Sequence, residues 1–288
     1  MRQVELVADY ACRTGENPLW HPMEQRLYWV DIPRGRIFRF DPATGMHEQC
    51  WEDGQVGGFT VQEDGSLLLF GEHGSVRVWR ERRIVRTIVE EIPGERGSRF
   101  NDVIADPAGR VFCGTMPRPD GSPGSLYRLD TDGKLVRLFG GLGCSNGMGF
   151  TLDRKRMYHT DSIPREISLF DYDARTGDLA KRGPFVRLPE GGLPDGMTVD
   201  AEGCVWSAIW GGSCIVRFGP DGKERERIGL PARLCSSLTF AGPECTDIFV
   251  TCACGEDANP CGAGDGGLYR VRGTGHRGVP EFLSRIML

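Results

Sequence analysis

The chain has 288 residues, with 40 acidic and 35 basic side chains and a formal net charge of −5. This length supplies an ample core, and the acidic balance without a run of Lys or Arg argues against a nucleic-acid partner. The longest apolar runs, such as Ser66–Phe70, are strand-sized, and the N-terminus lacks the pattern of a signal peptide. We therefore expect no membrane partner and a cytoplasmic protein.

The cysteines give no clear disulfide or zinc pattern. There are 11 of them, an odd number, and no Cys-x-x-Cys spacing occurs. Cys252, Cys254 and Cys261 lie close together in sequence, but no histidine is near enough to complete a structural zinc site. We therefore expect reduced thiols throughout.

A module of roughly 40 to 50 residues recurs along the chain, a length that is typical of propeller blades. Each copy predicts an inner strand, a Gly-containing turn, two further strands and a weaker fourth strand. In the first copy, the second and third strands are Leu27–Asp31 and Arg36–Asp41. The copies cover residues 17–51, 57–90, 101–141, 146–188, 195–230, and from Ser236 onward.

Repeated short antiparallel sheets protect their edges best when they close into a ring. The sequence therefore predicts an all-β fold, a six-bladed β-propeller of four-stranded antiparallel blades, as a single domain over residues 1–288. Residues Gln3–Ala8 alternate as a strand does, and we expect them to pair into the last blade.

Oxygen-bearing side chains occupy one phase of the repeat, immediately before or at the start of the inner strand. They are Glu16, Asn101, Asn146 and Asp195. In a propeller these positions meet at one mouth of the central channel, where two carboxylates and two amide oxygens suit a hard cation. The alternative is that Asn-Gly and Asp-Gly are ordinary turn dipeptides, which explains Asn146 and Asp195 but not Glu16.

Other polar residues are expected to have structural roles. Asp31 and Asp161 end second strands, and we expect them to brace loops by hydrogen bonds. His73 and His159 have no partner histidine at ligand spacing. Residues Gly143–Gly147 match the Gly-x-Ser-x-Gly nucleophile motif, but a strand rather than a helix follows Ser145, which argues against a serine nucleophile.

The inner-strand phrases belong to a longer series of motifs. In chain order these are Gly15-Glu16-Asn17-Pro18-Leu19-Trp20, Leu27-Tyr28-Trp29-Val30-Asp31-Ile32, Arg99-Phe100-Asn101-Asp102, Asp106-Pro107-Ala108-Gly109-Arg110, Gly114-Thr115-Met116, Ser145-Asn146-Gly147, Pro194-Asp195-Gly196-Met197 and Val250-Thr251-Cys252-Ala253. In this order and at these spacings, the series resembles the senescence marker protein/gluconolactonase family, which includes regucalcin and bacterial sugar lactonases.

The resemblance implies a six-bladed propeller with one divalent metal ion. It implies Glu16, Asn146 and Asp195 as metal ligands, with Asp195 also the general base. Asn101 would be a further ligand or a substrate contact, and Arg99 would bind substrate. The chain departs from some relatives after Gly114-Thr115-Met116, where Pro117-Arg118-Pro119 replaces an acidic pair that helps to hold substrate hydroxyls.

The expected activity is a metal-dependent lactonase that opens a sugar lactone, an aldonolactone, to its hydroxy acid through a metal-activated water. Ca, Zn, Mn, Mg and Fe(II) all suit such an oxygen-rich site. We expect a monomer or weak oligomer with a small-molecule partner. The alternatives are a hydrolase of another ester or phosphoester, and a calcium-binding regulatory propeller without catalysis.

Overall fold

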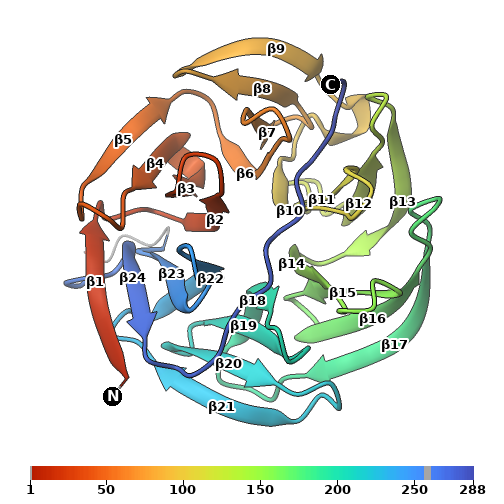
Figure 1. Ribbon diagram of the computed structural model, residues 1–288. Coiled ribbons are helices and arrows are strands. Elements are labelled where there is room, and N and C mark those ends of the chain that lie inside the picture. The colour runs from red at the N-terminus through yellow and green to blue at the C-terminus, as the bar shows by residue number, and fades with distance from the viewer. Residues whose placement is uncertain (1, 256–260) are drawn as a thin grey trace. The chain divides into compact units, whose positions relative to one another are not determined.

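The structure is a computed structural model that describes residues 2–255 and 261–288 (Figure 1). In these residues the chain forms 24 strands and two single-turn 3₁₀ helices, Ile32–Arg34 and Pro93–Glu95. Neither of these described helices has the length or the apolar character needed to cross a membrane. Neighbouring strands of each sheet pair antiparallel, so the predicted all-β class is confirmed.

The chain divides into two compact units, the described residues of 1–53 with 188–280, and residues 54–187 with 281–288. The second unit contains three four-stranded sheets, each with its strands in chain order. These strands are β6 (Val56–Val61), β7 (Leu67–Gly71), β8 (Val76–Arg80), β9 (Arg83–Val89), β10 (Phe100–Ala105), β11 (Val111–Thr115), β12 (Gly124–Leu129), β13 (Leu135–Leu142), β14 (Ser145–Phe150), β15 (Arg156–Asp161), β16 (Glu166–Tyr172) and β17 (Leu179–Arg187). The first strands contact one another, since β10 packs against both β6 and β14.

The other unit contains one four-stranded and one eight-stranded sheet. Its strands are β1 (Gln3–Asp9), β2 (Gly15–His21), β3 (Arg26–Asp31), β4 (Arg36–Phe40), β5 (His47–Glu52), β18 (Leu193–Val199), β19 (Val205–Trp210), β20 (Cys214–Phe218), β21 (Glu224–Gly229), β22 (Leu234–Ala241), β23 (Asp247–Ala253) and β24 (Gly267–Arg272). The eight-stranded sheet joins two groups of four, β18–β21 and β22-β23-β24-β1, through the single pair Trp210–Leu234. Strands β2 and β18 both contact β22.

Burial falls from the first strand of a group to the last. Every residue of β6 and of β14 is buried, whereas no residue of β9 is buried. The first strand contacts the first strands of neighbouring groups, and the last strand faces solvent. Within each unit the arrangement is therefore propeller-like, which supports the prediction of four-stranded propeller blades.

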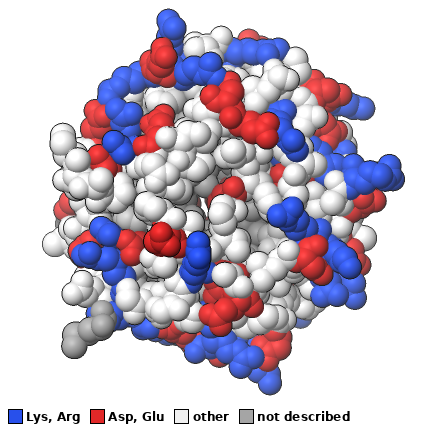
Figure 2. Space-filling model, viewed as in Figure 1, with Lys and Arg blue, Asp and Glu red and all other residues white. Residues whose placement is uncertain are grey.

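Apolar clusters fill the spaces between successive sheets of a unit. One of them joins Phe70 of β7 with Phe100 of β10 and Val111 of β11, and another joins Phe112 of β11 with Met148 of β14. In the other unit, Trp206 of β19 packs with Leu238 of β22. The surface carries acidic and basic side chains interspersed on the face that Figure 2 shows, in keeping with the small net charge.

Strand β1 pairs antiparallel with β24, from Gln3 opposite Arg272 to Asp9 opposite Gly267, which confirms the predicted pairing. Without β1, the hydrogen-bonding edge of β24 would be open and the buried Ala8 would leave the core. We expect deletion of residues 1–8 to lower the Tm by at least about 5 °C. Arg2→Ala, which removes only the exposed Arg2–Glu226 ion pair, is the control and should change the Tm little. An unchanged Tm after the deletion would show that β24 needs no partner.

His159 is a buried structural residue on β15. Its Nε2 lies 2.8 Å from the Ser145 Oγ, and its ring packs edge-on against Phe139 and Phe170. Burial, assisted by the charge of Lys181, lowers the pKa of His159 from 6.5 to about 4. The folded protein therefore keeps this ring neutral at pH values where an unfolded chain would protonate it.

The unfolded state binds more protons at this position between about pH 4 and pH 6.5, so stability falls as the pH falls through that window. We expect His159 to account for a loss of about 2 kcal/mol in the free energy of unfolding between pH 7.5 and pH 5. Urea denaturation at the two pH values should show a smaller loss for His159→Gln than for wild type. Equal losses would mean that His159 does not titrate in this way.

Candidate functional site

The first strand of each four-stranded group breaks its pairing register near its start. In β10 the break lies between Phe100 and Val103, in β14 between Ser145 and Met148, and in β18 between Pro194 and Met197. Strands β2, β6 and β22 have the same irregularity. Such a bulge leaves residues unpaired with the second strand and redirects their side chains.

The predicted site residues coincide with these bulges. Asn101, Asn146 and Asp195 lie inside the interrupted stretches, and Glu16 lies at the edge of the one in β2. All four side chains are buried, with exposed fractions of 3 to 5%. The shared phase that the sequence indicated thus has a structural cause, a local departure from strand pairing at the same place in each group.

The structure brings Arg99, Asn101 and Asn146 together in one hydrogen-bonded cluster. The Asn101 Nδ2 donates to the Asn146 Oδ1 at 2.7 Å and to the Ser145 carbonyl at 2.8 Å. The Arg99 Nη1 donates to the Asn101 Oδ1 at 2.6 Å and to the Phe100 carbonyl at 2.9 Å. This Arg99–Asn101–Asn146 cluster presents one guanidinium and two amides from β10, β14 and the loop before β10.

Ser162, which the sequence did not single out, fixes the orientation of Asn146. The Asn146 Nδ2 donates to the Ser162 Oγ at 2.8 Å, so the amide nitrogen is engaged on that side. The Asn146 Oδ1 accepts one bond from Asn101 and, as an amide oxygen, has a second acceptor position. That position is a suitable ligand atom for a hard cation.

Glu16 and Asp195 belong to the other unit, on β2 and β18. The glycines beside them allow the close approach of these strands to their neighbours. A Cβ on Gly196 would lie 2.1 Å from the Ser237 Oγ, and a Cβ on Gly15 would lie 2.5 Å from the Cys252 carbonyl oxygen. Any larger residue would push the carboxylate-bearing strand away from β22 or β23.

Asp31 and Asp161 brace the loops that lead into Glu16 and Asn146, as predicted. Asp161 accepts hydrogen bonds from the backbone N–H groups of Gly143 and Cys144 at 3.0 and 2.8 Å. Asp31 accepts one from the N–H of Thr14 at 3.1 Å. The two aspartates therefore position site residues through the backbone.

Asp102 is a further buried polar residue beside the cluster that the sequence analysis did not select. Its Oδ1 has no hydrogen-bond partner among the described residues, and only 8% of the residue is exposed. Burial raises the pKa of this carboxyl to about 7, and the positive charge of Arg99 opposes the rise. The signal in the sequence was the Asn101-Asp102 pair at the start of a predicted inner strand.

Ser145 is unsuited to act as a nucleophile. It is completely buried, and the residues directly after it form the strand β14 rather than a helix. Its hydroxyl contacts His159, which is itself 2% exposed. The Ser145–His159 pair is therefore part of the core, as expected for a serine that is not a nucleophile.

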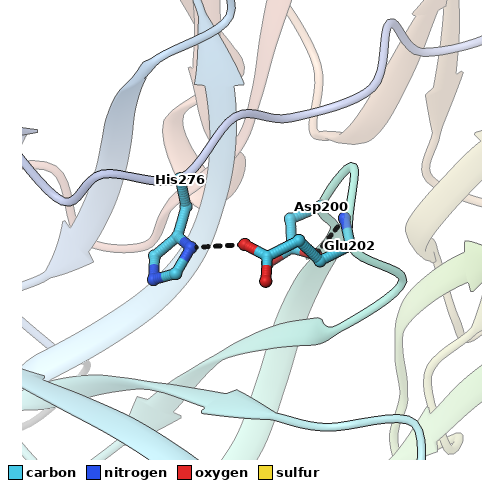
Figure 3. Close-up of side chains that lie close together, drawn as sticks. All are labelled: Asp200, Glu202 and His276. Atoms are coloured by element: carbon cyan, nitrogen blue, oxygen red, sulfur yellow. Dashed lines mark hydrogen bonds and ion pairs between the residues drawn. The ribbon is translucent and has the colours of Figure 1, made fainter.

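A second group of acidic and imidazole side chains, Asp200, Glu202 and His276, has ligand atoms within 4.8 Å of one another (Figure 3). The Asp200 Oδ2 accepts from the Trp206 Nε1 at 3.0 Å and from the Arg217 Nε at 2.7 Å. Both imidazole nitrogens of His276 face carboxylates, those of Glu202 and Glu226, at 2.8 and 3.0 Å.

The contacts of Asp200 make this group an ion-pair network. The Asp200 Oδ1 accepts the N–H groups of Glu202 and Cys204, just as the Asp106 Oδ1 accepts those of Ala108 and Arg110 in the other unit. Arg217 already supplies the cation, since it pairs with both Asp200 and Glu202. Asp200 therefore braces a turn of the repeat.

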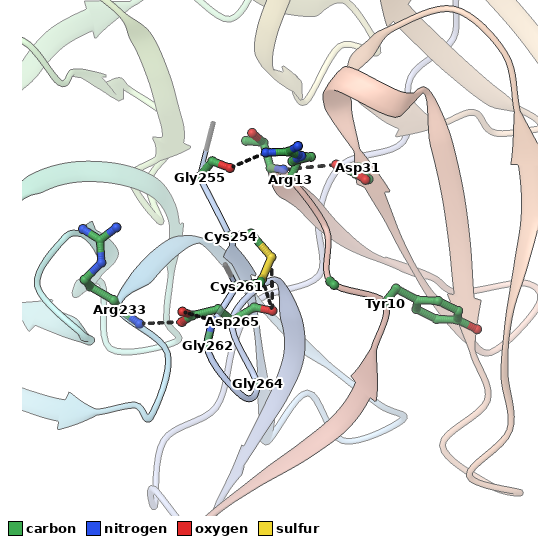
Figure 4. The surroundings of a disulfide bond; sticks show 12 residues. Tyr10, Arg13, Asp31, Arg233, Cys254, Gly255, Cys261, Gly262, Gly264 and Asp265 are labelled. Atoms are coloured by element: carbon green, nitrogen blue, oxygen red, sulfur yellow. Dashed lines mark hydrogen bonds between the residues drawn. A yellow bond between two sulfur atoms is a disulfide. The ribbon is translucent and has the colours of Figure 1, made fainter. Parts of the chain in front are cut away.

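The expectation of reduced thiols is wrong for two cysteines, because Cys254 and Cys261 form a disulfide (Figure 4). Their Cα atoms lie 5.0 Å apart, within the usual range for a disulfide. The spacing of seven positions matches none of the zinc or redox motifs, so it did not predict this bond. No other disulfide occurs in residues 2–255 and 261–288.

The disulfide lies next to the segment that leads into Glu16. The N–H of Cys254 donates to the Cys12 carbonyl at 2.9 Å, and that of Gly255 donates to the Arg13 carbonyl at 3.1 Å. The Arg13 Nη1 donates to the Gly255 carbonyl at 3.4 Å, as Figure 4 shows. Cys254 therefore anchors the chain that precedes β2.

The donor chemistry of the predicted ligands fits a hard divalent cation. Glu16 and Asp195 are buried carboxylates, and Asn146 is a buried amide whose oxygen has two acceptor positions, one of them used by Asn101. Oxygen donors of this kind bind Ca²⁺, Mg²⁺ or Mn²⁺, and carboxylates also bind Zn²⁺. Buried carboxylates are also more stable when a cation neutralises them.

Comparisons with known proteins agree with the motifs. The model of the family described as "SMP-30/Gluconolactonase/LRE-like region" matches residues 14–254. A pentonolactonase of Haloferax volcanii is 46% identical over 295 residues, covering 99% of each chain. Regucalcin of Homo sapiens is 31% identical over 294 residues, covering 97% of each chain.

Solved structures show the same fold. A luciferin-regenerating enzyme has a TM-score of 0.88 at 27% identity, covering 99% of this chain and 100% of that one. A calcium-binding regucalcin from Agrobacterium tumefaciens has a TM-score of 0.89 at 24% identity, covering 98% and 97%. From the family match and the full-length relatives together, we conclude that the chain belongs to the SMP-30/gluconolactonase family.

Proposed function

We propose that this protein is a metal-dependent lactonase that opens an aldonolactone, in particular a pentonolactone, to the corresponding hydroxy acid. The observation that carries the proposal is the Arg99–Asn101–Asn146 cluster, in which the two amides are buried at the bulges of β10 and β14. It combines donors for sugar hydroxyls with an amide oxygen for a cation. The 46% identity to a pentonolactonase over nearly the whole chain favours a five-carbon sugar acid lactone.

The proposed architecture is a single domain over residues 1–288, closed as a six-bladed propeller. The four-stranded groups of the two units and the pairing of β1 with β24 support it. The proposed metal ligands are Glu16, Asn146 and Asp195, whose oxygen donors suit Ca, Mg, Mn, Zn or Fe(II). When bound, such an ion polarises the lactone carbonyl and lowers the pKa of a water molecule.

In the proposed reaction, the protein's own residues orient the lactone and move protons. Arg99 and Asn101 hold the hydroxyls of the sugar ring, the former through its planar set of donors. Asp195 accepts a proton from the attacking water as the water oxygen bonds to the carbonyl carbon. The bond from the carbonyl carbon to the ring oxygen then breaks, the ring oxygen takes up a proton, and the hydroxy acid leaves.

The monomeric or weakly oligomeric state and the cytoplasmic location remain predictions from the sequence. The Cys254–Cys261 disulfide bears on the location, since disulfides are rare in reducing compartments. Thiol counting on protein trapped with an alkylating agent directly in cells would show whether this pair is oxidised there.

Turnover of a lactone panel tests the proposed function. In a pH-stat, the metal-loaded protein should release acid from pentono- and hexonolactones. Activity should vanish with a chelator and return when a divalent cation is restored. Activity only on other esters or phosphoesters would establish the first alternative. Metal binding without turnover of any of these substrates would establish the calcium-binding alternative.

Asp195→Asn separates metal binding from proton transfer. Because Asn keeps an oxygen ligand but cannot act as a base at this position, we expect kcat to fall by about 10²-fold or more with the fold intact. Metal content, circular dichroism and kcat should be measured on the same sample. Near wild-type kcat in a metal-loaded Asp195→Asn protein would remove Asp195 from the role of base.

A further inference from the structure

The loop that carries Arg99 contains a buried carboxylate that the proposed reaction does not use. Glu95 ends the 3₁₀ helix Pro93–Glu95 and is 1% exposed. Its Oε1 accepts a hydrogen bond from the Tyr127 hydroxyl at 2.7 Å, and its Oε2 lies 3.3 Å from the Arg118 Nη1. A buried carboxylate is tolerated only with such partners, and removing one partner of the set is costly.

Arg118 reaches this carboxylate from the segment Met116–Ser122, in which it lies between Pro117 and Pro119. The Arg118 Nη1 also donates to the Gly94 carbonyl at 2.8 Å. Arg118 is therefore turned toward the Arg99 loop, residues Pro93–Arg99. Its guanidinium pairs with the buried Glu95 at 3.3 Å and, more distantly, with the exposed Asp120 at 3.9 Å.

The same two segments are joined a second time, next to Arg99 itself. The N–H of Met116 donates to the Arg99 carbonyl at 3.0 Å, and the Ser98 Oγ donates to the Met116 carbonyl at 2.5 Å. The N–H of Ser98 donates to the Glu95 carbonyl at 2.8 Å. The Arg99 loop is thus fixed at its start by Glu95–Arg118 and at its end by Ser98, Arg99 and Met116.

Tyr127 connects Glu95 to the residue between Arg99 and Asn101. Its ring packs edge-on against Phe100, with ring centroids 6.4 Å apart, and Phe100 is completely buried. Burial and the neighbouring Glu95 raise the pKa of Tyr127 to about 12, so its hydroxyl remains a donor at neutral pH. Glu95 therefore acts on both sides of Arg99, through Arg118 and through Tyr127.

We propose that Glu95 is a positioning residue that holds the Arg99 loop in place through Arg118 and Tyr127. The Arg99 guanidinium thereby keeps its hydrogen bond to Asn101 and is oriented to bind the hydroxyls of the lactone. Through Arg118, the segment Met116–Ser122 affects substrate binding indirectly, by fixing Arg99. This inference rests on the proposed lactonase activity.

A comparison of two substrates, one with ring hydroxyls and one without, distinguishes a loss of Arg99 positioning from general damage to the site. Glu95→Gln keeps the shape and the acceptor for Tyr127 but removes the buried negative charge that faces Arg118. We expect it to lower kcat/KM for a pentonolactone about tenfold, mainly through KM, and to lower that for unsubstituted γ-butyrolactone less than about threefold. Arg118→Met should act similarly. Glu91→Gln is the matched control, because it removes the exposed ion pair between Glu91, just before the loop, and Arg96 in the loop. It should change kcat/KM for either lactone by no more than about twofold.

A double mutant tests whether Glu95 acts through Arg99. Arg99→Leu should lower kcat/KM for the pentonolactone about 10- to 100-fold, and Glu95→Gln should then add less than about twofold. Equal losses on both lactones, or fully multiplicative losses in the double mutant, would overturn the inference.

Hydrogen exchange gives a readout that does not depend on activity. Glu95→Gln should speed exchange of the Ser98 and Met116 amides relative to Glu91→Gln, and unchanged exchange would overturn the inference. If the wild type opens no lactone, the proposed function fails, and the exchange result still decides whether Glu95 holds the loop.

Discussion

The interruption of strand pairing near the start of each first strand is the constraint on which the candidate site depends. A regular strand would pair these residues with the second strand and send their side chains alternately to the two faces of the sheet. The bulges at Asn101, Asn146 and Asp195 free them from that pattern. The repeat thereby places polar side chains on otherwise apolar, buried strands without losing the core around them.

Burying so many polar groups is tolerated because the surrounding loops supply their partners. Asp161 holds the backbone before Asn146, Ser162 holds its amide nitrogen, and Asn101 contacts its oxygen. Asp31 does the same for the segment before Glu16. These contacts restrict the orientation of the site residues before any ligand binds, which is the arrangement that preorganised sites require.

Much of the fold could be predicted from the sequence, because the repeat carries it in local patterns. The strand Leu27–Asp31 and the turn after Asp106 follow from alternation and turn chemistry, and both are present. Asp31 and Asp161 were predictable as braces for the same reason. The meeting of Asn101 with Asn146 was expected from the common phase of the repeat, whereas Arg99 was expected only from the family resemblance.

Other features depend on contacts between distant segments and left no local pattern. The Glu95–Arg118 ion pair joins positions 23 residues apart, and the Tyr127 bond joins positions 32 apart. Asp102 belongs to one of the recurring motifs, but nothing in that motif indicated that its carboxyl would be buried. The Cys254–Cys261 disulfide depends on a loop conformation that spacing does not specify.

Anomalous diffraction from crystals of the protein soaked with Mn²⁺ would show whether Glu16, Asn146 and Asp195 bind one metal ion, because it locates an ion without assuming an activity. We expect one anomalous peak with the side-chain oxygens of these three residues all within about 2.0–2.6 Å of it. A peak at Asp200, Glu202 and His276 with none at the first three residues would contradict the proposed metal site. So would the absence of any bound ion at a saturating concentration of the metal.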